Sequence, residues 1–479
     1  MKILHAASEF YPLVKTGGLA DVLGALPYAQ QQFHDDIRLV LPYYRTVREK
    51  LPYTAEVARR DTFAGPLTVR YAEYGGLGLY LLDAPHLYDR PGNPYYNGHY
   101  QDYGDNAVRF GLLGWAAAAI ATGLDGWWGR ADVLHAHDWQ AGLAPAYLRH
   151  WHSDVRSVAT IHNIAYQGMF QAHHLAELQL PWHFYQTEGL EFYGQMSFLK
   201  AGLYYADRIS TVSPTYAREI TGEPAACGMG GLLDTRERQG RLYGILNGID
   251  SRVWNPAHDT ALPQPYSVQN TQGKQAAKTA LQQRFRLPEN PRALLACAVT
   301  RLTGSKGADL LVAALHDKLA AHPDMQFVLL GSGDPHWEYE FGELARRFPK
   351  QAAAHIGYHE ALAHLLIGGS DLILVPSRTE PCGLTQLYGL RYGTLPLVRR
   401  IGGLADTVTD TSEGSLRNRS ATGFVFDDPT PEALGGALEN ALARYRSPKE
   451  WQALVRQAMQ QDFDWHKAAE NYRALYRFD

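Results

Sequence analysis

Short apolar runs alternate with stretches of helical periodicity along most of the chain. Each run is shorter than a helix and is bounded by polar or turn-forming residues, which favours buried strands. Strands that alternate with helices are typical of βαβ units, in which helices cover a parallel sheet. The strands are expected at residues 1–5, 39–41, 131–135, 155–161 and 208–212, and again at 293–301, 325–330, 371–375 and 395–398, with helices at 306–319 and 385–392.

The α/β pattern occurs twice, which predicts two Rossmann-like domains. A chain of 479 residues exceeds the size at which one hydrophobic core usually stops growing. Residues 244–250 lead into a proline- and glutamine-rich stretch at 256–275, a composition typical of a connection. The expected domains are residues 1–243 and 244–457, followed by a terminal helix within 458–479 that could pack on either domain.

Composition and charge narrow the classes of partner. Hydrophobic residues make up 46% of the chain and charged residues 20%, as in an ordinary soluble globular protein. The net charge of -4 provides no long-range attraction for nucleic acid or an anionic membrane. The apolar run at residues 110–124 is shorter than the ~20 residues of a membrane span. Three distant cysteines, Cys227, Cys297 and Cys382, suggest neither disulfides nor zinc, so a cytoplasmic location is expected.

Residues 15–21 (KTGGLAD) form a glycine-containing loop between the first strand and a helical pattern. Such a loop lets a phosphate approach backbone amides at a helix start, and Lys15 adds positive charge. The alternative is a simple glycine turn with a solvated lysine. The letters GGLAD recur at residues 402–406, which indicates either a second helix start of the same kind or coincidence.

Two motifs in the second half carry groups suited to a nucleotide-sugar. Arg301 and Lys306 follow a strand and could neutralise a diphosphate leaving group, although they could also be exposed cations of a loop. Glu380 precedes Pro381 and the start of a helix, where a carboxylate can accept hydrogen bonds from sugar hydroxyls. The amides of residues 383–385 could face phosphate oxygens, or the segment could serve only as a helix cap.

The histidines of the first half leave several interpretations open. His135 and His137 share one face of a strand, as metal ligands do, but a metal site of this type requires further ligands in a single barrel. A packed core histidine is the plainer interpretation of His135. Asp138 and His162 follow successive strands and could contact a sugar. Tyr358 could stack on a nucleobase or be buried.

Taken together, these segments resemble the bacterial glycogen synthases and plant starch synthases. The resemblance covers nearly the whole chain, and its motifs are specific as a set. They are residues 15–21 (KTGGLAD), 137–139 (HDW), 160–163 (TIHN), 246–250 (LNGID), 301–303 (RLT) and 377–384 (SRTEPCGL).

The resemblance implies a glycosyltransferase B fold, with two Rossmann-like domains facing across a cleft and the last helix returning to the first domain. It implies a retaining hexosyltransferase that moves glucose from ADP-glucose to the non-reducing end of glycogen or a malto-oligosaccharide, with no metal ion or other cofactor. The implied catalytic residues are His162, Glu380, Arg301, Lys306 and Asp138, and the implied substrate-binding residues are Lys15, Gly18, Asp21, Asn247, Tyr358, Cys382, Gly383, Leu384 and Thr385.

Two positions depart from the family pattern. Ser305 stands where the family usually has glutamine, which affects only a side contact. Tyr388 stands where many retaining relatives place a second glutamate, so a two-glutamate grip on the nucleotide ribose is not expected. The competing functional classes are a pyridoxal-phosphate-dependent glucan phosphorylase and a non-catalytic glucan-binding protein.

Overall fold

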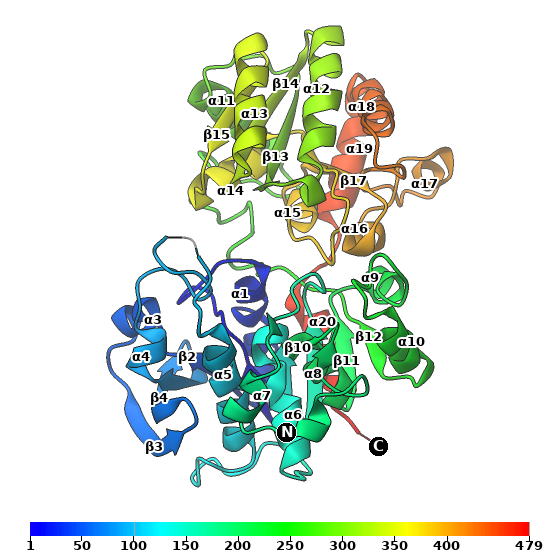
Figure 1. Cartoon of the computed structure of the whole chain (residues 1–479). Coiled ribbons are helices and arrows are strands. Elements are labelled where there is room, and N and C mark those ends of the chain that lie inside the picture. Colours follow the sequence, from blue (N-terminus) through cyan, green and yellow to red (C-terminus); the bar gives the residue numbers. More distant parts are fainter. Residues whose placement is uncertain (100, 479) are drawn as a thin grey trace. The chain divides into compact units, whose positions relative to one another are not determined.

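The computed structural model describes residues 1–99 and 101–478 and divides into two compact units (Figure 1). Unit 1 comprises residues 1–248 together with the segment that begins at Trp465, and unit 2 comprises Ile249–Asp464. The last helix, α20 (Trp465–Leu475), therefore belongs to unit 1, where Trp465 and Tyr472 are buried in the hydrophobic core. Each unit has its own core.

The main sheet of unit 1 has the strand order β12-β11-β7-β6-β1-β2-β5-β4-β3. The strands from β12 to β5 are parallel, and β4 and β3 form an antiparallel edge. The bounds are β1 (Lys2–Ala6), β2 (Asp36–Pro42), β3 (Ala55–Thr62), β4 (Gly65–Tyr74), β5 (Leu77–Asp83), β6 (Val133–His137), β7 (Arg156–Ile161), β11 (Arg208–Thr211) and β12 (Leu242–Gly244). A small antiparallel sheet contains β8 (Met169–Phe170), β10 (Gln195–Ser197) and β9 (Glu191–Phe192).

The sheet of unit 2 is parallel throughout, in the order β15-β14-β13-β16-β17-β18. Most residues of its central strands are buried, as expected for a sheet covered on both faces. The bounds are β13 (Leu294–Leu302), β14 (Met325–Gly333), β15 (Ala352–Ile356), β16 (Leu372–Val375), β17 (Leu395–Arg399) and β18 (Phe424–Phe426).

Helices connect the parallel strands in both units. In unit 1 they are α1 (Gly18–Leu23), α2 (Leu26–Gln31), α3 (Arg45–Lys50), α4 (Pro85–Tyr88), α5 (Asn106–Ala121), α6 (Leu143–His150), α7 (His174–Glu177), α8 (Phe198–Tyr205), α9 (Pro214–Glu219), α10 (Gly230–Arg238) and α20. In unit 2 they are α11 (Gln272–Arg284), α12 (Ala308–Ala321), α13 (Pro335–Arg347), α14 (Glu360–Gly369), α15 (Thr385–Tyr392), α16 (Gly402–Thr407), α17 (Glu413–Arg417), α18 (Pro431–Tyr445) and α19 (Pro448–Met459). Within the described residues, every helix is too short or too polar to cross a lipid bilayer.

Both parallel sheets contain a point at which the strand order reverses. In unit 1 the chain builds outward from β1 through β2 on one side and from β6 through β7 on the other. In unit 2 the same reversal lies between β13 and β16. Ligands of open parallel sheets bind beyond the carboxyl ends of the strands at such a switch point. The ligand-binding residues are therefore expected on the loops that follow β1, β6, β13 and β16.

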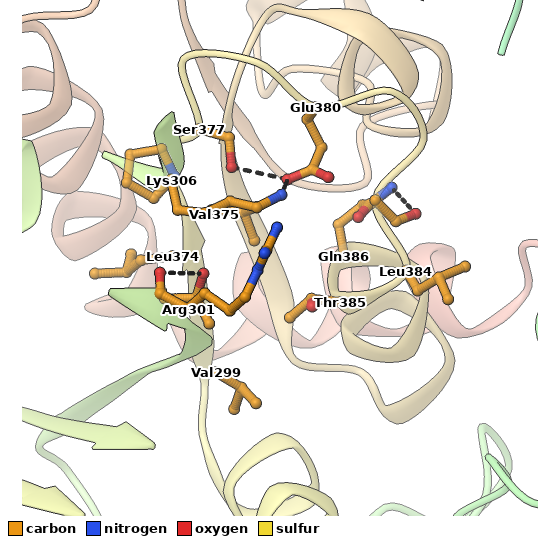
Figure 2. A pocket seen from close by; sticks show the side chains of 13 residues that line it. Val299, Arg301, Lys306, Leu374, Val375, Ser377, Glu380, Leu384, Thr385 and Gln386 are labelled. Carbon is orange, nitrogen blue, oxygen red and sulfur yellow. Dashed lines mark hydrogen bonds and ion pairs between the residues drawn. The ribbon is translucent and has the colours of Figure 1, made fainter. Parts of the chain in front are cut away.

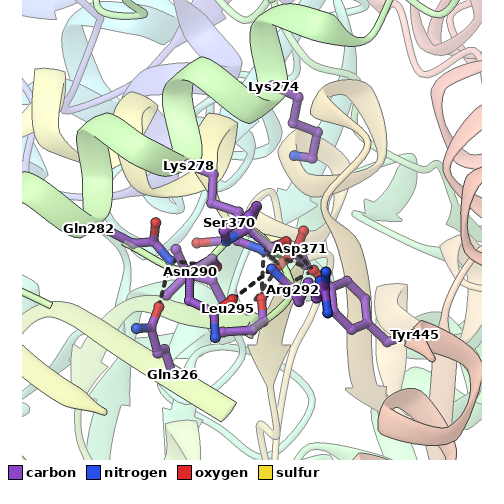
Figure 3. Close-up of polar contacts among 12 residues, drawn as sticks. Lys274, Lys278, Gln282, Asn290, Arg292, Leu295, Gln326, Ser370, Asp371 and Tyr445 are labelled. Atoms are coloured by element: carbon purple, nitrogen blue, oxygen red, sulfur yellow. Dashed lines mark hydrogen bonds and ion pairs between the residues drawn. The ribbon is translucent and has the colours of Figure 1, made fainter. Parts of the chain in front are cut away.

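A buried ion pair ties α11 to the sheet of unit 2 (Figure 3). The Lys278 ammonium lies 2.7 Å from Asp371 Oδ2 and also donates to the Ala293 carbonyl and the Tyr445 hydroxyl. Asp371 Oδ2 accepts a further hydrogen bond from the Leu295 amide. A buried charge without such partners would cost several kcal/mol. The network thus fixes the amino ends of β13 and β16, while the loops at their carboxyl ends remain available for ligands.

Lys274 lies one turn earlier on α11, and the effect of burial on its ammonium group can be tested by the pH dependence of unfolding. Its ammonium donates to the Gly368 and Tyr392 carbonyls and to Thr394 Oγ1, and burial lowers the pKa of Lys274 to about 7. Between pH 7 and 10 the unfolded chain therefore binds more protons at this position, and the free energy of unfolding rises with pH by roughly 1.4 kcal/mol per unit. Lys274→Met should remove this rise, as measured by urea unfolding at pH 7.5 and pH 9.5.

The exposed Lys449 supplies the matched control, since Lys449→Met should leave the pH dependence of unfolding unchanged. A difference between wild type and Lys274→Met that stays constant from pH 7.5 to pH 9.5 would contradict the lowered pKa.

Candidate active site

A pocket opens at the switch point of unit 2, beyond β13 and β16 and beside the start of α15 (Figure 2). It brings together six of the residues singled out from the sequence, and Thr300, Ser377 and Gln386 also line it. The six are Arg301, Lys306, Glu380, Gly383, Leu384 and Thr385. The structure therefore places two cations, a carboxylate and the start of a helix in one pocket of this unit.

Lys306 and Glu380 form an ion pair within the pocket. Lys306 Nζ lies 2.6 Å from Glu380 Oε2, which also accepts a hydrogen bond of 2.8 Å from the Ser377 hydroxyl (Figure 2). Both charged side chains are largely buried, with 19% and 10% of their surfaces exposed. An incoming anion would compete with Glu380 for the lysine, which frees the carboxylate to accept hydrogen bonds from hydroxyl groups. Ser377 lies in the same motif as Glu380 but was not predicted as a site residue.

The loop that carries Lys306 approaches β16 closely. The predicted helix at residues 306–319 begins at Ala308 instead, because Gly304–Lys306 forms a 3-10 turn and Gly307 has a φ of 72°. A Cβ at Gly307 would lie 2.3 Å from the Pro376 carbonyl oxygen. Only glycine combines this backbone conformation with this close contact. The turn thereby holds Lys306 against the strand that leads to Glu380.

The segment that precedes α15 is held by the amide side chain of Gln386, which lies in the first turn of that helix. Gly383 has a φ of +71°, and a Cβ there would lie 2.4 Å from Gln386 Oε1. Gln386 Nε2 donates to the Cys382 and Gly383 carbonyls at 3.0 and 2.9 Å. The first turn of α15 lines the pocket, and the N–H groups of a helix start favour an anion. Gln386 was not predicted.

The second GGLAD segment, at residues 402–406, packs against the loop that carries Glu380. Both copies begin a helix, α1 in unit 1 and α16 in unit 2, which agrees with the first of the two interpretations of this repeat. The Gly403 amide donates to the Glu380 and Pro381 carbonyls at 3.2 and 3.1 Å. A Cβ at Gly403 would lie 2.1 Å from the Cys382 carbonyl oxygen. In unit 2 the glycines therefore allow the backbone of this segment to pack closely against the backbone of the Glu380 loop.

Two predicted binding residues of unit 2 do not line this pocket. Cys382 is buried, and the pocket wall is formed by the residues that follow it. Tyr358 follows β15, and its side chain is 74% exposed, so the alternative of a buried tyrosine is wrong. Its ring is accessible for stacking against a planar ligand.

In unit 1 the loop after β1 is organised by Glu9, which sequence reasoning missed. The Glu9 carboxylate accepts hydrogen bonds from the Thr16 amide and hydroxyl, the Gly17 amide and the Tyr95 hydroxyl, at 2.5 to 3.0 Å. The amides of Thr16 and Gly17 are thus already used by the protein. A Cβ at Gly18 would meet nothing within 4 Å, so its backbone borders open space.

Lys15 on this loop is not an isolated cation. Its ammonium lies 2.7 Å from Asp21 Oδ1 at the start of α1, and both side chains remain partly exposed. An exposed pair of this kind contributes little to stability. The arrangement holds the Lys15 ammonium close to the glycines of the loop.

Asp138 and His162 lie together beyond β6 and β7. Asp138 Oδ1 accepts hydrogen bonds from the His162 amide at 2.7 Å and the Asn163 amide at 3.4 Å. Burial raises the pKa of Asp138 to about 7. Its backbone has a φ of 55° and a ψ of -169°, a conformation that costs non-glycine residues about 1–3 kcal/mol. Strain and a perturbed pKa in one residue are typical of a functional site.

The histidines of β1 and β6 form a buried cluster. Ring nitrogens of His5, His135 and His137 lie within 4.8 Å of one another, as in a metal site. Both ring nitrogens of each histidine already have hydrogen-bond partners in the protein, so a metal ion would have to displace these bonds. This geometry favours the interpretation of His135 as a satisfied core residue over that of a metal ligand.

Asn247 lies just after β12 and is buried. Among residues 1–99 and 101–478, its side-chain oxygen has no hydrogen-bond partner. A buried polar atom without a partner costs about 1–3 kcal/mol, and such atoms occur at binding sites that a ligand completes.

Two α/β units, with a cationic pocket at one switch point and a buried carboxylate–histidine site at the other, define the class of glycosyltransferases with the B fold. The chain matches the family model described as the starch synthase catalytic domain over residues 2–235. Residues 280–458 match the model described as glycosyl transferases group 1.

Relatives resemble the chain over its full length. It is 56% identical to the glycogen synthase of Actinobacillus pleuropneumoniae serotype 5b over 477 residues, which cover 100% of this chain and 99% of the relative. Identity to the Haemophilus influenzae Rd glycogen synthase is 55%, with 99% of each chain covered. The chain belongs to the glycogen synthase family of glycosyltransferases.

Solved structures show the same fold. The catalytic domain of starch synthase IV from Arabidopsis thaliana, bound to ADP and acarbose, matches with a TM-score of 0.86 at 29% identity, covering 99% of this chain and 98% of that one. Sucrose-phosphate synthase from Thermosynechococcus elongatus shares the fold, with a TM-score of 0.58 at 16% identity and the same coverage of both chains.

Proposed function

We propose that this chain transfers glucose from ADP-glucose to the non-reducing end of an α-1,4-glucan, with retention of the anomeric configuration. Glycogen or a malto-oligosaccharide is the proposed acceptor, and the cytoplasm is the proposed location. The proposal assigns the donor to unit 2 and the glucan to unit 1. The observation that carries it is the unit 2 pocket, in which Arg301, Lys306 and the first turn of α15 supply positive charge at a switch point.

The pocket suits the diphosphate of the donor. Fixed cations and backbone N–H groups stabilise the negative charge that develops as the bond between sugar and phosphate breaks. The related starch synthase IV has the same fold over its length and was solved with ADP bound. The exposed ring of Tyr358 is the proposed stacking partner of adenine, and Lys15, Gly18 and Asp21 are proposed to contact the donor from the loop after β1.

Hydroxyl-binding groups are proposed in both units. Glu380 would accept hydrogen bonds from the glucose once a diphosphate engages Lys306. Asp138 and His162 are proposed to contact the same sugar. The unpartnered oxygen of Asn247 would accept a hydrogen bond from one of its hydroxyl groups. These assignments explain why a strained aspartate and an unsatisfied amide oxygen are retained in the fold.

The proposed reaction needs no covalent enzyme intermediate. The bond between C1 of glucose and the phosphate oxygen breaks, and the 4-hydroxyl oxygen of the glucan bonds to C1 from the same face. The departing phosphate accepts the hydroxyl proton, so ADP leaves and the glucan gains one glucose. A short-lived species with oxocarbenium character links the two events, and the cations of the pocket lower its energy.

The test uses the full chain with labelled ADP-glucose, labelled UDP-glucose and glycogen. We expect glucan-dependent release of ADP, slower release of UDP, and a product whose new linkage is α by NMR. A protein that binds glycogen without releasing ADP would be a glucan-binding module, and a pyridoxal absorbance band would indicate a phosphorylase. Either result would contradict the proposal.

A further inference from the structure

A row of buried side chains leads from the core of unit 1 to His162. Gln30 Oε1 lies 2.7 Å from His5 Nε2, and His5 Nδ1 lies 2.9 Å from His137 Nε2. His137 Nδ1 in turn lies 2.9 Å from His162 Nε2. We call His5, His137 and His162 the histidine chain. It crosses from β1 to β6 to the end of β7, at the switch point where Asp138 also lies.

All three rings of the histidine chain are neutral at ordinary pH. Burial lowers the pKa of His5 to about 4 and that of His162 to about 3, and it also lowers the pKa of His137 well below its usual value. A neutral imidazole has one nitrogen that donates and one that accepts. Each hydrogen bond of the chain therefore fixes the direction of the next one.

Gln30 sets that direction. Its amide nitrogen donates to the Tyr476 hydroxyl at 2.9 Å, which leaves its oxygen facing His5. His5 must then donate from Nε2 and accept at Nδ1. By the same rule His137 donates from Nε2, and His162 donates from Nε2 to His137. The Nδ1 atom of His162 is left as an acceptor, and no described residue occupies it.

A second series of hydrogen bonds begins at Tyr476, and it is consistent with the same assignment of donors and acceptors. The Tyr476 hydroxyl accepts from Gln30, so its single hydrogen is free to donate to His135 Nδ1 at 2.7 Å. His135 then donates from Nε2 to Thr160 Oγ1 at 2.5 Å, and Thr160 can donate to the Ser210 hydroxyl at 2.6 Å. Every bond is satisfied with neutral rings. Tyr476, which follows α20, thus links the C-terminal segment to Gln30 and, through Gln30, determines which nitrogens of the histidine chain donate.

We infer that Gln30, Tyr476, His5 and His137 are positioning residues that hold His162 as the Nε2–H tautomer, with Nδ1 kept as a hydrogen-bond acceptor for a hydroxyl group of the bound sugar. The inference rests on the proposed function for the identity of the ligand. If the hydrogen bonds of the histidine chain ran in the opposite direction, His162 Nδ1 would carry the proton and could not accept a hydrogen bond from that hydroxyl group. The terminal segment would thereby act on the sugar site through buried polar contacts alone.

The direct test is NMR of the full chain labelled with ¹⁵N-histidine at neutral pH, because protonated and unprotonated ring nitrogens have well-separated shifts. The His162 signals are identified by their loss in His162→Gln. We expect a protonated Nε2 and an unprotonated Nδ1. The reverse tautomer, or a rapid average of the two, in the wild type would overturn the inference without bearing on whether ADP is released.

Tyr476→Phe tests the origin of the direction. Without the hydroxyl, the Gln30 amide can turn, and we expect a mixture of His162 tautomers together with a fall of about tenfold in kcat/KM for ADP-glucose. Tyr472→Phe is the matched control, because Tyr472 is also buried on α20 and the hydrogen bonds traced above run through Tyr476 instead. Equal tautomer ratios in the two variants would overturn the role of Tyr476.

Discussion

Lys306→Ala is expected to lower turnover by about 10²–10³-fold while the protein remains folded. The lysine is fixed at the pocket by the turn before α12, and a fixed donor at a developing oxyanion contributes about 3–4 kcal/mol to transition-state stabilisation. Arg301→Ala should reduce turnover for the same reason. Steady-state kinetics with ADP-glucose and glycogen measure both effects, and circular dichroism checks the fold.

Lys318→Ala provides a close control for Lys306→Ala. Lys318 also pairs with a glutamate, Glu439, at 2.6 Å, and its side chain has the same exposed fraction of 19%. It lies on α12 outside the residues that line the pocket. Loss of this pair should leave turnover within about twofold, because Glu439 is 46% exposed and neither partner lines the pocket. Similar turnover in the two variants would remove Lys306 from the proposed mechanism.

Asp138→Asn is expected to lower kcat/KM by about 10–100-fold and to remove an acidic limb of the pH profile. In the wild type, burial raises the pKa of Asp138 to about 7, so the accepting carboxylate is lost as the pH falls through 7. Hydrogen bonds to charged groups contribute about 1.5–3 kcal/mol, which sets the size of the loss. The asparagine variant should have a low kcat/KM that does not fall further as the pH is lowered from 8 to 6.

The free energy of unfolding separates this loss from misfolding. A carboxyl whose pKa is raised in the folded state destabilises the fold above its unfolded pKa, so Asp138→Asn should not lower stability at pH 8. Asp207→Asn is the control, because Asp207 accepts the Ser157 amide at 2.9 Å at the amino end of the same sheet. If the control loses as much activity as Asp138→Asn, the role assigned to Asp138 is wrong.

The sequence predicted most of the parallel strands, because a strand covered on both faces is a continuous apolar run. The run at 371–375 became β16, and 385–392 became α15 with the predicted bounds. The edge hairpin of β3 and β4 was missed, since β3 is largely exposed and polar and shows no such run. Edge strands satisfy one side of their backbone with water, so their sequences need few apolar residues.

Site residues were predictable where charge or glycine marked a strand end, as for Lys306 and Gly383. Glu9 and Tyr476 were missed because their partners are distant in sequence. Glu9 contacts Tyr95 across 86 positions, and Tyr476 contacts Gln30 across 446 positions. Such contacts depend on strand order, which the local pattern does not contain. The sequence likewise left His135 open between a metal ligand and a core residue, and the hydrogen bonds of its ring favour the core residue.

A crystal structure of the full chain with bound ADP would show whether the pocket of unit 2 holds the diphosphate. We expect diphosphate oxygens within hydrogen-bonding distance of Lys306 Nζ, the Arg301 guanidinium and the amides of residues 383–385. If an ordered diphosphate binds elsewhere on the protein, with Lys306 still paired to Glu380, the role assigned to this pocket is wrong.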